Sequence, residues 1–226
     1  MTLRNDRYEG PDDIPDMVPV FPLSGALLLP RAHLPLNIFE PRYLEMIDDA
    51  LASDRVIGMV QPRFDGSVDS EGDQPPLCEV GALGRIISFQ ETSDGRYLIQ
   101  LGGVTRFHIM NEVACDKPYR VCRISAELFA GDLLHRDVDS DVDRDALIRA
   151  FQSYLDANDL EADWKSVRAA SNEALVNTLA MMSPYGPAEK QALLEAPDLA
   201  ARAATLVAIT EMELARNAGG DKPTLN

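Results

Sequence analysis

Cysteine is scarce in this sequence, and its spacing argues against two kinds of structural role. The three cysteines, Cys78, Cys115 and Cys122, form an odd number with no C-x-x-C pair. A disulfide framework needs paired cysteines, and a structural zinc site needs closely spaced ligands. We therefore expect inert thiols, with neither disulfides nor zinc.

Positive charge and long apolar runs are also lacking. The chain has 21 lysines and arginines against 37 acidic residues, which gives a formal net charge of −16. Binding to nucleic acid or to an anionic membrane needs a cluster of basic side chains, so neither is an expected partner. No stretch of 18 apolar residues occurs, and the polar, acidic N-terminus has no secretory signal core. We expect a cytoplasmic location.

Recognisable catalytic and metal-binding motifs are missing as well. The sequence has no P-loop, G-x-G-x-x-G, H-E-x-x-H or G-x-S-x-G. His33, His108 and His135 stand in unrelated contexts, without the partner that a general base needs. Aspartate alternates through residues 137–145, but every register lacks the glycine and glutamate of an EF-hand. We predict no catalytic residue, cofactor or metal, and interpret the aspartates as an acidic linker that complements a helix N-terminus.

Five prolines punctuate an apolar stretch at residues 19–43. Proline fixes φ near about −65° and removes a backbone donor, so no helix or central strand can run through the whole stretch. The pattern predicts short extended pieces at 18–21, 26–29 and 34–38, then a helix that begins at Pro41.

The chain beyond this stretch changes from strand to helix patterns near residue 130. Strands are predicted at 55–61, 80–90, 97–101, 104–110 and 119–128, with Asp94-Gly95 as a hairpin turn. Glycines at 81, 84, 102 and 103 indicate a sheet that curls into a small barrel. Helices are expected after caps at Asp141 or Asp143, Ser171 and Asp198. The predicted parts are a disordered arm (1–16), a β-rich subdomain (17–129), an acidic linker (130–142), a helical bundle (143–217) and a flexible tail (218–226).

Several segments taken together resemble the N-terminal substrate-binding domain of Lon, the ATP-dependent protease, in its stand-alone bacterial form. The segments are PVFPL (19–23), ALLLP (26–30), LPLNIFEPRY (34–43), VIGMV (56–60), VGALGRI (80–86), DG (94–95), LGGVTRF (101–107), DW (163–164) and EKQALLEA (189–196). The resemblance covers most of residues 17–216.

The resemblance implies an α+β fold, with a β-rich PUA-like pseudo-barrel that carries one early helix and a C-terminal α-helical bundle. It also implies a non-catalytic module that binds unfolded or extended polypeptides in protein quality control. The nucleotide-binding motif and the Ser-Lys proteolytic domain of Lon have no counterpart in the sequence, so we expect neither ATP hydrolysis nor peptide cleavage.

The apolar stretch supplies the candidate binding residues, Leu28, Leu29, Leu36 and Phe39, provided that their surface is open. The same side chains could instead fill the core. Two other functions remain open. One is a small-molecule sensor or enzyme with a pocket between the barrel and the bundle. The other is an adaptor that docks on a separate protease or chaperone through acidic faces or the loop at 63–77.

Overall fold

The computed structural model describes residues 8–63, 75–134 and 141–218. These residues divide into two compact units, one formed by Met1–Arg136 with Tyr185–Leu194 and one by Asp137–Pro184 with Glu195–Asn226. Predictions for residues 1–7, 64–74, 135–140 and 219–226, which include most of the loop at 63–77, lie outside the described residues. No helix in the described ranges has the length and hydropathy needed to span a membrane.

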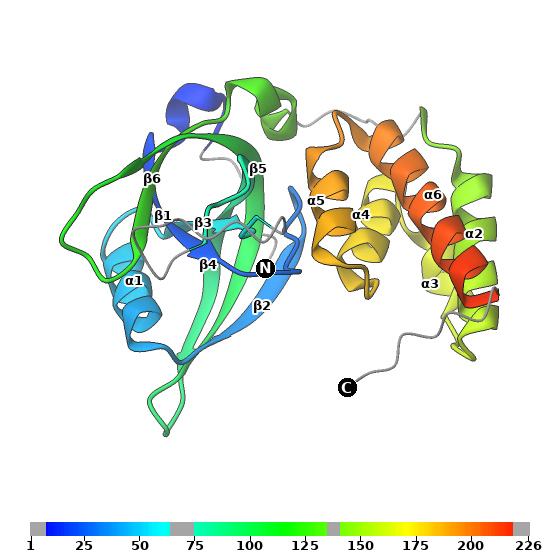
Figure 1. Ribbon diagram of the computed structural model, residues 1–226, viewed down its shortest axis with the longest axis horizontal. Helices are drawn as coiled ribbons and strands as arrows, with labels where there is room; N and C mark the ends of the chain where they lie inside the picture. Colours follow the sequence, from blue (N-terminus) through cyan, green and yellow to red (C-terminus); the bar gives the residue numbers. More distant parts are fainter. Residues whose placement is uncertain (1–7, 64–74, 135–140, 219–226) are drawn as a thin grey trace. The chain divides into compact units, whose positions relative to one another are not determined.

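A six-stranded mixed sheet forms the first unit (Figure 1). Its strands are β1 (Met17–Pro22), β2 (His33–Ile38), β3 (Val56–Val60), β4 (Val80–Glu91), β5 (Tyr97–Val113) and β6 (Arg120–Ser125). The order is β2-β5-β4-β3-β1-β6, and β5 also pairs with β6. Only β1 and β3 are parallel. The strands β5, β4, β3, β1 and β6 therefore form a closed circuit of pairings. Among the described strands, β2 alone has a single partner, β5. The predicted α+β class is confirmed.

The proline-rich stretch forms two of its three predicted extended pieces. Strands β1 and β2 and the helix α1 (Pro41–Ala52) lie where the prolines predict them. Residues 26–29 form no strand, which corrects the third prediction. The Leu28 and Leu29 side chains are buried there. The Leu28 side chain and the Leu29 carbonyl lie against Gly84 and Gly103, which pair with each other across β4 and β5.

The N-terminal arm, predicted to be disordered over residues 1–16, is ordered from Tyr8 onward. Tyr8 and Ile14 are buried with the apolar side chains of the sheet. The Arg85 guanidinium donates to the Tyr8 hydroxyl at 3.2 Å. Between the two residues lies a short 3-10 helix, η1 (Pro11–Asp13). Burial of these two apolar side chains explains the order that composition alone did not predict.

The strand β5 joins two segments that were predicted as separate strands. It runs for 17 residues through Gly102 and Gly103, and its register with β4 shifts next to Gly84. The Asp94-Gly95 hairpin is confirmed, since Gly95 has a φ of +79° and the Gly95 amide donates to the Thr92 carbonyl at 3.0 Å. The predicted last strand ends early, at Ser125, and the 3-10 helix η2 (Glu127–Leu133) follows it.

Helices make up the second unit. They are α2 (Arg144–Ala157), α3 (Trp164–Ala169), α4 (Asn172–Met182) and α6 (Leu199–Ala218). The predicted caps are confirmed: Asp143, Ser171 and Asp198 each accept a hydrogen bond from an amide three residues later. These helix ends follow from local sequence because a cap bonds only to its own first turn.

The helix α5 (Pro187–Glu195) belongs largely to the first unit, although the predicted bundle (143–217) included it. The buried Gln61 amide of the sheet unit donates to the Pro187 carbonyl at 3.0 Å and to Gln191 Oε1 at 3.1 Å. Gln191 donates in turn to the Val80 carbonyl at 3.0 Å. Buried amides need such partners, so these bonds fix α5 against the start of β4.

A buried ion pair connects β5 to η2 and α5. The Arg106 side chain is 4% exposed and lies with Nε 2.8 Å from Asp132 Oδ2. Its Nη2 donates to Asp132 Oδ1 at 2.9 Å, and its Nη1 donates to the Leu194 carbonyl at 3.0 Å. The Phe129 ring centroid is 4.4 Å from the guanidinium carbon. One arginine thus holds three separate segments.

Substitution of Gly103 by alanine should destabilise the protein. A Cβ atom there would lie 2.0 Å from the Leu29 carbonyl oxygen, so the backbone must move, at a cost of about 1–3 kcal/mol. Chemical denaturation should show this loss for Gly103→Ala. The control is Gly131→Ala, where a Cβ meets nothing within 4 Å; equal stability of the two variants would contradict the prediction.

Removal of the Asp132 carboxylate should cost more than removal of an exposed one. Asp132→Ala leaves the Arg106 charge buried without its carboxylate, and we expect a loss of about 3–5 kcal/mol in the free energy of unfolding. Glu40→Ala breaks an exposed pair with Arg42 and should change that free energy by less than about 0.5 kcal/mol. Similar losses in both variants would show that burial does not set the strength of the Asp132 pair.

Candidate functional site

The structure separates the four predicted binding residues. Leu28 and Leu29 are 1% and 0% exposed, whereas Phe39 is 60% exposed. Leu36 is partly buried. The requirement of an open surface therefore fails for Leu28 and Leu29, which fill the core because the facing glycines of β4 and β5 leave room for them. Phe39 meets the requirement.

The outer part of β2, β5 and β4 presents a solvent-facing surface. Pro35 pairs with Gln100 and Asn37 with Leu98 across β2 and β5. Across β5 and β4, Gln100 pairs with Ser88 and Leu98 with Gln90. Paired residues lie side by side on one face of a sheet. We call these six residues the open face; all are exposed except Gln100, which is partly buried.

Two large apolar side chains are exposed at the open face. Leu98 is 42% exposed, and Phe39 follows the end of β2. Continuing the β2–β5 register beyond Ile38 and Tyr97 brings Phe39 opposite Arg96, diagonal to Leu98. The Arg96 guanidinium carbon lies 5.7 Å from the Phe39 ring centroid, and Arg96 also pairs with Asp94 at 3.0 Å. The result is an apolar surface bordered by polar and charged groups.

Leu36 lies on the opposite face of the same strands. It pairs with Ile99, which pairs with Phe89. The Phe89 and Tyr97 rings are in edge-to-face contact, with centroids 4.8 Å apart. Desolvation raises the pKa of Tyr97, and a hydrogen bond to Asp48 of α1 raises it further. Alternation along β2 thus places Leu36 and Phe39 on different faces.

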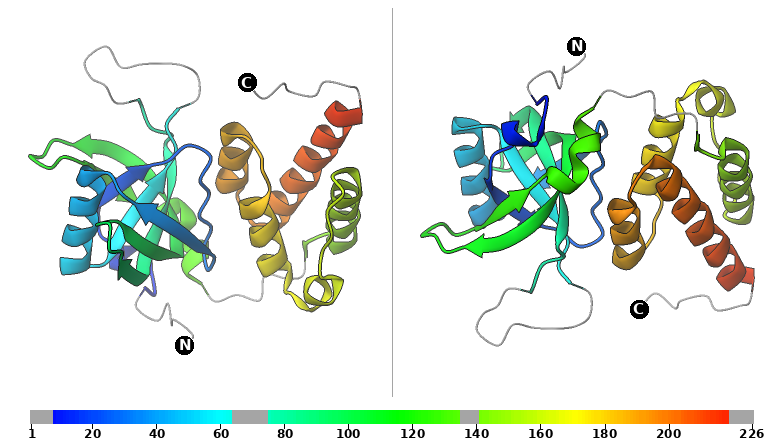
Figure 2. Two further views of the ribbon diagram at one scale, coloured as in Figure 1. Left: turned by 90° about the horizontal axis from the view of Figure 1, so that it is seen from below. Right: turned by 90° about the horizontal axis from the view of Figure 1, so that it is seen from above.

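Polar contacts of α1 hold this helix beside the strands of the first unit (Figure 2). The Lys117 ammonium lies 2.6 Å from Asp49 Oδ2, and the Tyr119 hydroxyl donates to the same oxygen at 2.5 Å. Hydrogen bonds from Lys117 and Tyr119 lower the pKa of Asp49. Because Glu40 alone separates Phe39 from the first residue of α1, these contacts also restrict the position from which Phe39 projects.

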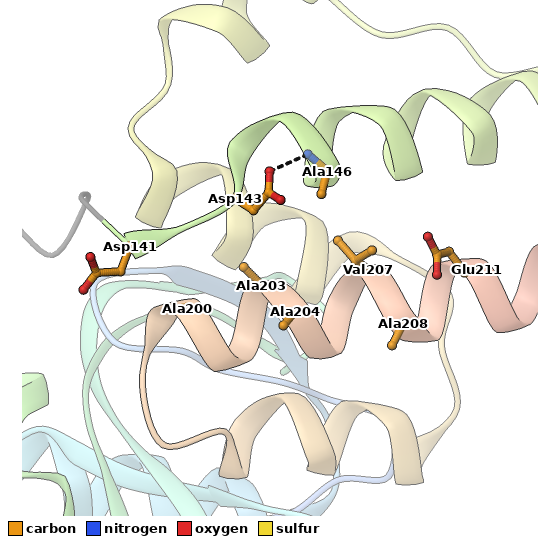
Figure 3. Close-up of a pocket in the computed structure, with 9 residues that line it drawn as sticks. All are labelled: Asp141, Asp143, Ala146, Ala200, Ala203, Ala204, Val207, Ala208 and Glu211. Atoms are coloured by element: carbon orange, nitrogen blue, oxygen red, sulfur yellow. Dashed lines mark hydrogen bonds between the residues drawn. The ribbon is translucent and has the colours of Figure 1, made fainter.

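A separate pocket of about 390 Å³ lies within the second unit (Figure 3). Alanines and Val207 of α6 form much of its wall, and Asp141, Asp143 and Glu211 add carboxylates. The Asp143 carboxylate is engaged as the α2 cap, through a bond of 2.9 Å from the Ala146 amide. The residues that line it are Asp141, Asp143, Ala146, Ala200, Ala203, Ala204, Val207, Ala208 and Glu211. This set contains no histidine, cysteine, serine or lysine, and its ionisable side chains are the carboxylates of Asp141, Asp143 and Glu211.

Metal-binding and redox groups do not gather elsewhere in the described ranges. No cluster of three or more His, Cys, Asp or Glu side chains suited to a metal is found in those ranges. Cys78 and Cys122 are buried and Cys115 is exposed. Burial raises the pKa of the Cys122 thiol to about 11, which keeps it protonated and unreactive at neutral pH.

Comparison with known proteins gives the family. A model of the ATP-dependent protease La (LON) substrate-binding domain matches residues 17–211. The chain belongs to the Lon substrate-binding domain family. Lon protease 2 of Sorangium cellulosum is 27% identical over 88% of this chain and 25% of its own length. Lon protease of Parabacteroides distasonis is 28% identical over 92% of this chain and 25% of its own length. The chain thus spans about a quarter of these Lon proteases.

Solved structures show the same fold. The Lon N-terminal domain protein from Xanthomonas campestris superposes with a TM-score of 0.59 at 22% identity, over 85% of this chain and 97% of that one. The N-terminal domain of the Mycobacterium avium complex Lon protease gives a TM-score of 0.60 at 17% identity, over 86% and 98%. The Lon resemblance seen in the sequence motifs is confirmed.

Sequence reasoning missed Leu98 and the rest of the open face. A usable signal was present, because residues 97–101 alternate between sheet faces and place Leu98 opposite to the buried Ile99 and Leu101. The signal was incomplete without the pairing partners, since alternation does not say which face is covered.

Acid should weaken the Asp49 contacts. Because the folded-state pKa of Asp49 lies below its ordinary value of 3.8, this carboxylate adds stability above that value and loses it as the pH falls through the folded-state pKa. We expect Asp49→Asn to lower the melting temperature at pH 7 and to flatten its decline below about pH 4.

The control for Asp49→Asn is Asp116→Asn, an exposed change in the segment that carries Lys117. This variant should melt like the parent protein across the same pH series. An unchanged acid profile in Asp49→Asn would contradict the role of Asp49.

Proposed function

We propose that the chain is a non-catalytic module that binds unfolded or extended polypeptide segments at the open face and Phe39. The observation that carries the proposal is the exposure of both Phe39 and Leu98, which the continued β2–β5 register places diagonally on one face, in a member of the Lon substrate-binding domain family. Apolar side chains on a sheet surface suit polypeptides that expose their own apolar residues.

We further infer that the first unit is the PUA-like pseudo-barrel implied by the resemblance. The circuit of pairings through β5, β4, β3, β1 and β6 supports this inference, since each of these strands has a partner on both sides. Helix α1 is its early helix, and the second unit corresponds to the α-helical bundle.

We also propose that such a module serves as an adaptor that delivers polypeptides to a separate protease or chaperone. Family membership supports this role, because the matched relatives are Lon proteases of which this chain covers only the substrate-binding part. The alternative of a small-molecule sensor or enzyme gains less support from the pocket of the second unit, where the Asp143 carboxylate is already engaged as the cap of α2.

Loss of Phe39 or Leu98 should weaken polypeptide binding. Burial of either side chain against a ligand contributes about 1.5–3 kcal/mol, so Phe39→Ser or Leu98→Ser should each raise the Kd about tenfold or more. Fluorescence anisotropy with labelled, reduced and alkylated lactalbumin measures this Kd.

The matched control is Met110→Ser, because Met110 is also 60% exposed but lies at the other end of β5. It should leave the Kd within about twofold. The absence of binding at high micromolar concentration, or an equal loss in the Met110 variant, would count against the proposal.

A further inference from the structure

The outer edge of β2 is a row of backbone groups that point away from the rest of the sheet. The Gly103 amide donates to the Ala32 carbonyl at 2.8 Å, which fixes the hydrogen-bonding phase of β2 against β5. In an antiparallel pair, bonded and non-bonded residues alternate. Leu34, Leu36 and Ile38 therefore bond to β5. The peptide groups of His33, Pro35 and Asn37 face outward.

These outward groups form a defined pattern of donors and acceptors. His33 and Asn37 each present an N–H and a carbonyl, whereas Pro35 presents only a carbonyl. All three residues are exposed. Within the described ranges, no other strand pairs with this edge. The pattern suits the backbone of one more extended chain.

The side chains of an added strand would meet the open face. Residues opposite His33, Pro35 and Asn37 lie on the same face as those residues. That face carries Leu98 and continues to Phe39. A bulky apolar side chain near the Asn37 end of an added strand would therefore lie diagonal to Phe39, with Leu98 one strand further away on the same face.

We propose that polypeptides bind this chain as an added antiparallel strand along the outer edge of β2, with an apolar side chain against Phe39 on the face that also carries Leu98. This inference rests on the proposed function and specifies how the same surface recognises its substrate. The substrate class is an extended segment without proline at the paired positions. Recognition uses backbone groups that every such segment has, together with one apolar contact.

Pro35 favours a foreign polypeptide over a second copy of this chain. If two β2 edges paired antiparallel about Pro35, both central residues would lack an N–H, and both of their carbonyls would lack a donor. A foreign strand supplies an N–H donor for the Pro35 carbonyl. Only the carbonyl of the foreign residue opposite Pro35 is then left without a donor. Proline on an edge strand is also a known protection against edge-to-edge association.

Substitutions at the edge separate backbone pairing from side-chain contact. Asn37→Pro removes an outward N–H but no bond to β5, and it should raise the Kd for an added strand about tenfold. Asn37→Thr replaces the same side chain but keeps the N–H, so it should lose clearly less affinity than Asn37→Pro. Pro35→Val adds the missing donor and should lower the Kd about threefold or more.

The probe is a fluorescein-labelled nonapeptide of alternating valine and threonine, with a central phenylalanine and a lysine at each end.

Backbone N-methylation of the probe tests the same point with the unaltered protein. When successive peptide nitrogens of the probe are methylated one at a time, the rise in Kd should alternate between about tenfold and almost none. Every second N–H of the probe faces β2, and only those take part in the pairing. This series remains a test even if Asn37→Pro fails to fold.

Failure of this inference can be told apart from failure of the proposed function. Binding that depends on Phe39 but shows no alternation in the methylation series would overturn strand addition and leave polypeptide binding intact. Sedimentation that shows dimers resistant to the probe and dissociated by Asn37→Pro would identify a second copy as the occupant, which also overturns the proposal.

Discussion

The buried charge of Arg106 is the constraint on which the first unit depends. A guanidinium removed from water is costly unless its donors are satisfied. Asp132, the Leu194 carbonyl and the Phe129 ring provide that compensation from segments far from Arg106 in the sequence. The strand β5 therefore cannot bury this residue until η2 and α5 are in place. The first unit is complete only with residues that the chain contributes after residue 184.

The way this core closes also decides which side chains remain for recognition. Leu28 and Leu29 fit against facing glycines and are removed from the surface. Leu36 is partly buried on the face that carries Ile99 and Phe89. Phe39 is therefore the most exposed of the four apolar candidates. The proposed binding surface is therefore the outward face of three strands together with Phe39 at the end of β2.

Proline has two effects in the β2 region. Pro41 starts α1 two residues after Phe39, so the position of Phe39 is tied to a helix held by the Asp49 contacts. Pro35 interrupts the donors of the β2 edge and lowers the tendency of the edge to pair with another copy. The formal net charge of −16 acts in the same direction, because copies of the chain repel each other. Both features disfavour self-association through the β2 edge.

Local sequence determined the features that depend on neighbouring residues. The Gly95 turn, the start of α1 at Pro41 and the caps Asp143, Ser171 and Asp198 are where the pattern places them, since each needs only the residues next to it. The combined motifs also sufficed for the Lon substrate-binding family. Tertiary structure alone decided the order of the arm from Tyr8, the burial of Leu28 and Leu29, the place of α5 and the exposure of Leu98. Each of these depends on a partner distant in sequence, and periodicity says that a face is apolar without saying what covers it.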